Sequence, residues 1–260
     1  MQLMVFTDLD GTLLDHESYS SADAAPALAL LKSLNVPVVL ASSKTAAEIA
    51  PLQAELGLSE WPAIVENGAT TLEPGADTVD DRDAYEALRA ALREIPADLR
   101  RMFRGFGDMG VDEIMRHTKL DFEAAARAGD RSHSEPGLWS GTDEDEASFL
   151  AALATHGVAA RRGGRFLTLS FGGTKAGAMA GIITKYQPAR TLALGDAPND
   201  TEMLELADFG VIVRNDHGPG IPELPGEKNG SIRRTELAGP AGWNKAVLDV
   251  VQELKLQESA

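Results

Sequence analysis

Carboxylate side chains follow two short apolar runs of this sequence, at points where buried strands are expected to end. Asp8 and Asp10 come directly after the run at 3–6, and Asp196 follows the run at 191–194. In a doubly wound sheet the carboxyl ends of the strands meet at one crevice, so these side chains are expected to lie together. Mg²⁺ is a hard cation that prefers a few carboxylates together with water and phosphate oxygens. The spacing therefore predicts a Mg²⁺ site.

Two single residues are expected at the same crevice. Ser42 directly follows the apolar run at 36–41, and we prefer it to the adjacent Ser43 because the strand is expected to end there. Lys175 follows a Gly-Gly-Thr stretch and opens a predicted helix. Single aspartates and lysines at such places also serve as helix caps, turn residues or solvated side chains. It is their combination that favours a site.

The elements that must position these residues alternate between strands and helices. Apolar runs and helical spacing predict them, in order, at 3–6, 24–34, 36–41, 45–56 and 63–65. Such alternation is typical of a parallel sheet covered by helices on both faces. We therefore expect an α/β fold with a doubly wound parallel sheet, whose third strand ends in the turn Glu66-Asn67-Gly68.

An inserted module interrupts this pattern. Amphipathic helices are expected at 83–95 and 144–156, with loops around 102–115. The expected division is a catalytic core of residues 1–81 and 169–260 and an insertion of residues 82–168.

The strand–helix pattern then resumes. Expected elements are a helix at 174–186, strands at 191–194 and 210–213, and a closing helix at 243–256. The stretch 215–239 is rich in Gly and Pro and is expected to form a long ordered loop.

Composition restricts the partners. The chain of 260 residues has 24 Lys and Arg against 40 Asp and Glu, a net charge of −16. Such a charge repels nucleic acid and anionic lipid surfaces, and no basic run offsets it, so neither a nucleic acid nor a membrane is expected as a partner. The absence of cysteine, of a signal-peptide pattern and of an apolar run long enough for a membrane span leads us to expect a soluble cytoplasmic protein.

Four stretches resemble, in order and approximate spacing, the motifs of the haloacid dehalogenase-like (HAD) phosphatase superfamily. They are DLDGTLL at 8–14, Ser42 after a strand, Lys175 at a helix start and GDAPND at 195–200. The insertion resembles the α/β cap of the superfamily's second cap class, subfamily IIB. The resemblance implies a Rossmann-like HAD core with an inserted cap domain. It also implies a Mg²⁺-dependent phosphomonoester hydrolase that acts through an aspartyl-phosphate intermediate.

The resemblance also implies roles for single residues. Asp8 resembles the nucleophile and Asp10 the general acid and base, while substrate binding falls to Ser42, Lys175 and Asn199. The implied metal ligands are Asp8, Asp10, Asp196 and Asp200. These roles are chemically consistent, because a metal ion removes the repulsion between a carboxylate nucleophile and a phosphate dianion. A protonated Asp10 could donate to the departing alkoxide and then accept a proton from water.

Three further stretches restrict the range of candidate substrates. RSHSEP at 131–136, GGRF at 163–166 and GPAGWN at 239–244 are similar to the mannosyl-3-phosphoglycerate phosphatases, which make the compatible solute mannosylglycerate. Their substrate carries a carboxylate and a phosphate beside sugar hydroxyls. The resemblance thus implies that Arg131 and Arg165 hold the carboxylate and that Glu135 accepts hydrogen bonds from hydroxyls.

Other functions remain open at this point. The substrate could be glucosyl-3-phosphoglycerate or a broader set of sugar phosphates such as sucrose phosphate. A phosphosugar mutase would differ by a bisphosphate activator and an isomerised product. A non-catalytic module that binds Mg²⁺ and phosphate would not need the acid and base that Asp10 supplies, which argues against it.

Overall fold

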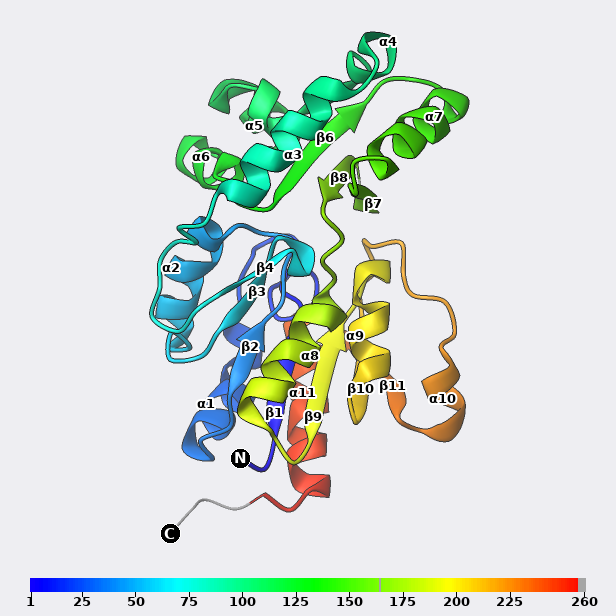
Figure 1. Ribbon diagram of the computed structural model, residues 1–260. Coiled ribbons are helices and arrows are strands. Elements are labelled where there is room, and N and C mark those ends of the chain that lie inside the picture. Colours follow the sequence, from blue (N-terminus) through cyan, green and yellow to red (C-terminus); the bar gives the residue numbers. More distant parts are fainter. Residues whose placement is uncertain (164, 257–260) are drawn as a thin grey trace.

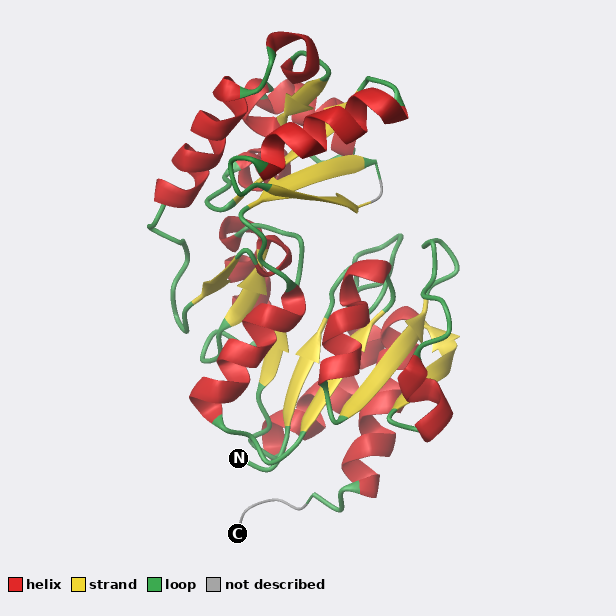
Figure 2. Cartoon of the chain, turned by 45° about the vertical axis from the view of Figure 1, so that its right-hand side comes forward, coloured by secondary structure: helices red, strands yellow, loops and turns green. Residues whose placement is uncertain are grey.

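The computed structural model describes residues 1–163 and 165–256, which form two lobes (Figure 1). The lower lobe is built on a parallel sheet and the upper lobe on an antiparallel sheet (Figure 2). Two segments of the chain, 73–82 and 171–174, connect the lobes. Within the described residues, the helices are too short or too polar to cross a membrane.

The parallel sheet contains the strands that the sequence predicted around the site. Its strands, in the order β11-β10-β9-β1-β2, are β11 (Ile232–Ala238), β10 (Phe209–Arg214), β9 (Thr191–Gly195), β1 (Met4–Thr7) and β2 (Val38–Leu40). All pairs are parallel, and Thr7 lies beside both Leu194 and Leu40. The loops after β1, β2 and β9 therefore leave the sheet side by side, as the doubly wound α/β prediction requires.

Helices cover both faces of this sheet. Val5 packs toward α1 (Ala25–Ser33), α2 (Ala46–Leu56) and α11 (Gly239–Glu253), whereas its neighbours Met4 and Phe6 pack toward α8 (Lys175–Tyr186) and α9 (Thr201–Leu206). Successive side chains of a strand point to opposite faces, so a strand buried on both faces reads as a continuous apolar run. This explains why the run at 3–6 predicted β1 correctly.

The prediction that the third strand belongs to the parallel sheet is wrong. β3 (Ala63–Val65) pairs antiparallel with β4 (Thr70–Leu72), and a single parallel bridge from Ile64 to Ala41 links it to the end of β2. The turn η2 (Glu66–Gly68) causes this, because Glu66, Asn67 and Gly68 all have positive φ and return the chain on itself.

The prediction of a long loop at 215–239 is also wrong. This stretch contains α10 (Pro225–Asn229) and the edge strand β11. Among residues 1–163 and 165–256, β11 has a partner strand on one side alone, and most of its side chains are exposed or half-buried, so it lacks the apolar run of a buried strand. The closing helix α11 begins at Gly239, four residues before the expected start, because proline is accepted in the first turn of a helix.

The inserted module forms its own sheet and core. The antiparallel sheet has the order β5-β6-β8-β7, with β5 (Phe103–Gly105), β6 (Ser134–Trp139), β8 (Phe166–Ser170) and β7 (Ala159–Gly163). Its helices are α3 (Asp83–Glu94), α4 (Ala97–Arg100), α5 (Val111–Thr118), α6 (Phe122–Gly129) and α7 (Asp143–Ala154). Helices α3 and α7 confirm the two predicted helices.

Two details of the module differ from the expectation. The expected loops around 102–115 instead contain β5, the turn η3 (Phe106–Asp108) and α5, elements too short for a clear period in the sequence. Strand β8 continues to Ser170, beyond the expected boundary at 168. Leu167 and Leu169 of β8 are buried in the module's core, while Phe166 and Thr168 line a cavity facing the parallel sheet.

Candidate active site

A cavity of about 390 Å³ lies between the two lobes. The core contributes Asp8, Asp10, Lys44, Asn67 and Asn199 to its wall. The module contributes a more cationic wall that includes Arg131, Arg161, Arg162 and Arg165. The structure therefore gathers five of the ten predicted site residues, Asp8, Asp10, Asn199, Arg131 and Arg165, around one space.

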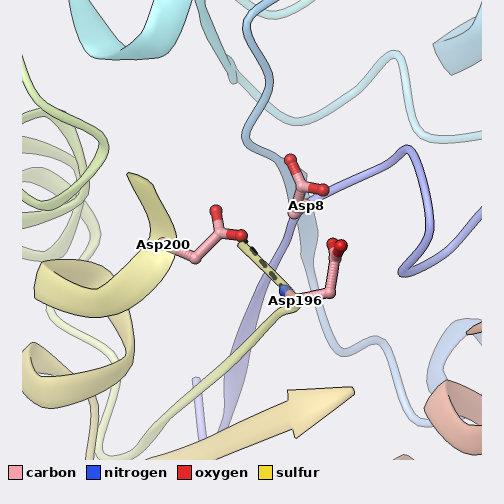
Figure 3. Close-up of side chains that lie close together, drawn as sticks. All are labelled: Asp8, Asp196 and Asp200. Carbon is pink, nitrogen blue, oxygen red and sulfur yellow. Dashed lines mark hydrogen bonds between the residues drawn. The ribbon is translucent and has the colours of Figure 1, made fainter. Parts of the chain in front are cut away.

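Asp8, Asp196 and Asp200 form the acidic floor of the site (Figure 3). Each offers a carboxylate oxygen, and these oxygens lie within 4.8 Å of one another. Burial raises the pKa of both Asp8 and Asp196. Closely spaced buried carboxylate oxygens are the donor set of a hard divalent cation, so these residues could hold one.

Lys175 is the cation within this group. Its ammonium Nζ lies 2.5 Å from Asp8 Oδ1 and 2.7 Å from Asp200 Oδ1, and the side chain is almost fully buried. Burial opposes its charge, but Asp200 and Asp8 outweigh this and raise its pKa above the ordinary value. Thr174 caps α8 by accepting from the backbone N–H of Gly177, which fixes the helix start that carries Lys175.

Two residues that sequence analysis missed hold Asp196 in place. Thr12 Oγ1 donates to Asp196 Oδ1 at 2.6 Å, and Asn215 Nδ2 donates to Asp196 Oδ2 at 2.7 Å. Thr12 belongs to the DLDGTLL stretch, and Asn215 directly follows β10. The same signal that found Asp196, a polar residue after an apolar strand, could have found Asn215.

Gly11 allows the two loops to meet. Its φ is +84°, and a Cβ there would lie 2.3 Å from Asn215 Nδ2 and 3.1 Å from Asp196 Oδ2. A larger residue would therefore have a strained backbone and would displace the side chains of Asn215 and Asp196. Asp200 is fixed in another way, by accepting from the backbone N–H groups of Asp196 and Ala197 at 3.1 and 3.0 Å.

Asp10 lies at the cavity but outside the group of Asp8, Asp196 and Asp200, so its role as a fourth metal ligand stays a prediction. Its Oδ2 is 2.9 Å from Lys44 Nζ, and its Oδ1 is inaccessible and has no hydrogen-bond partner among the described residues. Burial lowers the pKa of Lys44, but Asp10 and Glu48 outweigh this and raise it. Lys44 was missed by the sequence analysis, although it lies two residues beyond Ser42.

Ser42 and Asn199 occupy different depths of the site. Ser42 is buried, and its Oγ accepts from the backbone N–H of Lys44 at 3.2 Å, whereas the adjacent Ser43 lines the cavity. Asn199 lines the cavity and donates to Asn67 Oδ1 at 3.0 Å. Asn67, from the turn η2, was not among the predicted site residues.

The three predicted residues of the module have different surroundings. Arg131 lines the cavity and donates to the carbonyl oxygens of Ala128 and Ser43, both at 2.9 Å. Arg165 also lines it, is exposed, and donates to the carbonyl of His117. Both arginines are therefore placed where a bound anion could reach them.

The predicted contact of Glu135 with substrate hydroxyls is wrong, because the side chain points away from the cavity. Its side chain is fully buried and accepts from Tyr85 Oη at 2.6 Å, Arg89 Nη1 at 2.7 Å and the backbone N–H of Gly107 at 2.9 Å. Its neighbour on β6, Pro136, lines the cavity, and successive residues of a strand face opposite sides. In this structure Glu135 stabilises the interior of the module and has no access to a substrate.

Comparisons with known proteins agree with this geometry. The chain is 33% identical to a protein of Persephonella marina (strain DSM 14350 / EX-H1) named glucosyl-3-phosphoglycerate/mannosyl-3-phosphoglycerate phosphatase, over 97% of this chain and 98% of the relative. The family model of haloacid dehalogenase-like hydrolases matches residues 5–96 and 168–218. The unmatched stretch between them falls on most of the inserted module.

Solved structures share the whole fold. The sucrose-phosphatase of Synechocystis sp. PCC6803 is 16% identical with a TM-score of 0.63, covering 98% of each chain. A phosphatase of the haloalkanoate enzyme superfamily from Bacteroides thetaiotaomicron is 18% identical with a TM-score of 0.66, covering 99% of this chain and 96% of that one. Together with the family match, these findings show that the chain belongs to the haloacid dehalogenase-like hydrolases and is a phosphatase with a cap.

Proposed function

We propose that the protein is a Mg²⁺-dependent phosphomonoester hydrolase that works through an aspartyl-phosphate on Asp8. The observation that carries this proposal is the buried group of Asp8, Asp196 and Asp200, in which Lys175 pairs with Asp8 and Asp200 and Asp8 lines the cavity. Asp8, Asp196 and Asp200 would hold the cation. When bound, Mg²⁺ supplies positive charge that offsets the repulsion between these carboxylates and a phosphate.

The residues divide the reaction into two displacements. An oxygen of Asp8 attacks phosphorus, the ester P–O bond breaks, and the departing alkoxide takes a proton from Asp10. Asp10 then accepts a proton from water as that water attacks phosphorus, which breaks the bond to Asp8 and releases phosphate. Lys175 neutralises charge beside Asp8, and Lys44 orients Asp10 through its 2.9 Å contact.

Ser42 and Asn199 have supporting roles in this proposal. Ser42 stabilises the loop that presents Ser43 and Lys44, since it accepts from the backbone N–H of Lys44. Asn199 lies in the cavity wall and can donate to a phosphate oxygen or to a substrate hydroxyl.

For the substrate we propose mannosyl-3-phosphoglycerate, with glucosyl-3-phosphoglycerate as the second candidate. The name of the relative from Persephonella marina includes both. The cationic wall also supports a substrate with two anionic groups, because Arg131 and Arg165 line the cavity of a protein whose net charge is −16. The phosphate would lie at Asp8 and the carboxylate at these arginines.

The proposal is tested by measuring phosphate release from the two glycosyl-3-phosphoglycerates, sucrose 6-phosphate and p-nitrophenyl phosphate, each with Mg²⁺ and with EDTA. We expect activity that requires Mg²⁺ and the highest kcat/KM for a glycosyl-3-phosphoglycerate. Undiminished activity in EDTA would contradict the metal site. A higher kcat/KM for sucrose 6-phosphate would contradict the substrate while leaving the phosphatase chemistry intact.

A further inference from the structure

The turn η2 holds a buried carboxylate that the proposed chemistry does not use. Glu66 is 2% exposed and directly follows β3. Its φ is +51° and that of Asn67 is +60°, a left-handed conformation that residues other than glycine seldom adopt. Strained backbone of this kind persists where the surrounding contacts enforce it. The contacts of Glu66 are therefore informative.

On one side, Glu66 binds the start of the cap's central strand. Its Oε1 accepts from the backbone N–H and the Oγ of Ser132 at 2.9 and 2.7 Å. Its Oε2 accepts from the backbone N–H of His133 at 3.1 Å and from the Oγ of Ser134 at 2.6 Å. Burial opposes the charge, but Arg131 and these donors outweigh it and hold the pKa of Glu66 below its ordinary value. Glu66 therefore binds as a carboxylate.

On the other side, the same turn contacts the loop with Ser42 and Lys44 and the start of α8, which together with the acidic floor are called the catalytic floor below. The backbone N–H of Glu66 donates to the carbonyl of Lys44, and that of Asn67 donates to the carbonyl of Ser42, both at 2.9 Å. A Cβ on Gly68 would lie 2.1 Å from the carbonyl oxygen of Thr174, so this turn packs directly on the start of α8 that presents Lys175.

We propose that Glu66 is a positioning residue that fixes segment 131–134 of the cap to the loops of the catalytic floor. Arg131 begins this segment and donates to the carbonyl of Ser43 across the two lobes. Glu66 would thus set the distance between the cationic wall and the acidic floor, and with it the length of substrate that spans them. This proposal rests on the proposed function for its kinetic consequence, but the contact itself can be measured without any substrate.

The substitution Glu66→Gln tests the contact sharply. Glutamine has nearly the same shape, and the backbone hydrogen bonds from the turn to Lys44 and Ser42 do not involve the side chain. The four side-chain contacts of Glu66 all come from donors, and two of these are backbone N–H groups, of Ser132 and His133, one on each oxygen. Whichever way the amide is turned, its NH₂ would face one of these N–H groups, leaving it unpaired.

Amide hydrogen exchange followed by NMR measures the contact directly. In Glu66→Gln, we expect the amide proton of either Ser132 or His133, whichever faces the new NH₂ group, to exchange at least about tenfold faster, the scale of one lost hydrogen bond to a charged group. The matched control is Asp208→Asn. Asp208 also accepts from a backbone N–H and a hydroxyl, both of Thr191, but lies at the amino end of β9, away from the cap. Unchanged exchange at Ser132 and His133 in Glu66→Gln would overturn the proposal.

Steady-state kinetics separates positioning from general support. We expect Glu66→Gln to lower kcat/KM for a glycosyl-3-phosphoglycerate by about ten- to hundredfold, mostly through KM, because Arg131 would lose its fixed place. For p-nitrophenyl phosphate, which has no carboxylate to reach the cap, the change should stay within about threefold. Equal losses on both substrates would mean that Glu66 supports the catalytic floor itself and would overturn the positioning role.

A milder variant covers the case in which Glu66→Gln does not fold. Ser134→Ala removes a single hydroxyl donor to Glu66. We expect it to give the same selective kinetic loss at a smaller size, about tenfold. A wild-type enzyme inactive on every phosphoester would refute the proposed function, whereas the exchange measurement would still decide whether Glu66 holds the cap.

Discussion

The two lobes each bury carboxylates, but with different charge balance. In the cap, Glu135 receives hydrogen bonds from Tyr85, Arg89 and Gly107, so one carboxylate faces a neutralising guanidinium and two further donors. In the core, Asp8, Asp196 and Asp200 lie together, and the ammonium of Lys175 pairs with Asp8 and Asp200, while Asp196 accepts from the neutral donors Thr12 and Asn215.

Burial raises the pKa of Glu135 as it raises that of Asp8, so burial alone does not distinguish the two groups. The distinction lies in the partners. A buried carboxylate with a full set of donors stabilises its surroundings, whereas a group with more negative than positive charge needs a cation or a reaction to balance it. This difference supports our proposal that the core group is catalytic and that Glu135 is structural.

The largest expected effect on activity comes from the core group, in which three carboxylates lie beside one lysine. Asp8→Asn should lower kcat by roughly ten-thousandfold, because the amide cannot attack phosphorus, and single catalytic groups contribute on that scale. The circular dichroism spectrum should be unchanged, since the side chain lines the cavity. Residual activity within tenfold of wild type would place the nucleophile elsewhere.

Glu135, which is paired with Arg89, should affect stability and not catalysis. Glu135→Ala removes one partner of a buried pair and should lower the free energy of unfolding by ~3 kcal/mol, the low end of the range for such pairs, because Arg89 is 22% exposed. Urea denaturation measures this. The folded variant should hydrolyse p-nitrophenyl phosphate at close to the wild-type rate. A loss of activity comparable to that of Asp8→Asn would mean that Glu135 takes part in catalysis.

Much of this contrast was readable in the sequence. The short apolar runs before Asp8 and Asp196 predicted two buried parallel strands, and parallel strands bring their carboxyl ends together. The role of Thr12 could not be predicted because it depends on how the loops after β1 and β10 fold against each other around Gly11, whereas Asn215 has the same pattern as Asp196, a polar residue directly after an apolar strand.

The misassigned residues show where sequence alone is insufficient. Asp8 and Asp10 were expected to face one point, and both line the cavity, but Asp10 pairs with Lys44 and lies outside the group of Asp8, Asp196 and Asp200. Glu135 alternates with Pro136 on β6, and a period of two cannot say which face the cap's helices cover. The edge strand β11 carries Arg233 at a half-buried position and Arg234 at an exposed one, so its sequence lacks the pattern of a buried strand.

An intermediate effect is expected from the cationic wall of the cap. Arg165→Ala should lower kcat/KM for a glycosyl-3-phosphoglycerate by about ten- to hundredfold, since a charge-assisted contact contributes about 1.5–3 kcal/mol. Arg131→Ala should do the same. The comparison substrate is p-nitrophenyl phosphate, on which both variants should approach wild type. Equal losses on the two substrates would show that the arginines serve the fold or the phosphate.

The smallest expected effect concerns Lys44. Its ion pair with Asp10 is partly exposed, with 22% and 37% of the two side chains accessible. Such pairs contribute up to ~1 kcal/mol, so Lys44→Met should lower kcat by about fivefold. The loss should be similar for both kinds of substrate, because Asp10 serves the reaction itself. A loss confined to the glycosyl-3-phosphoglycerates would instead assign Lys44 to substrate recognition.

The transfer of the phosphoryl group to Asp8 is tested most directly by the stereochemical course at phosphorus. A phosphomonoester made chiral with three oxygen isotopes is transferred by the enzyme to an alcohol acceptor in place of water, and the configuration of the product is determined. Two in-line displacements, first by Asp8 and then by the acceptor, each invert phosphorus, so we expect net retention. Net inversion would mean that the acceptor attacks the substrate directly, and would contradict a covalent role for Asp8.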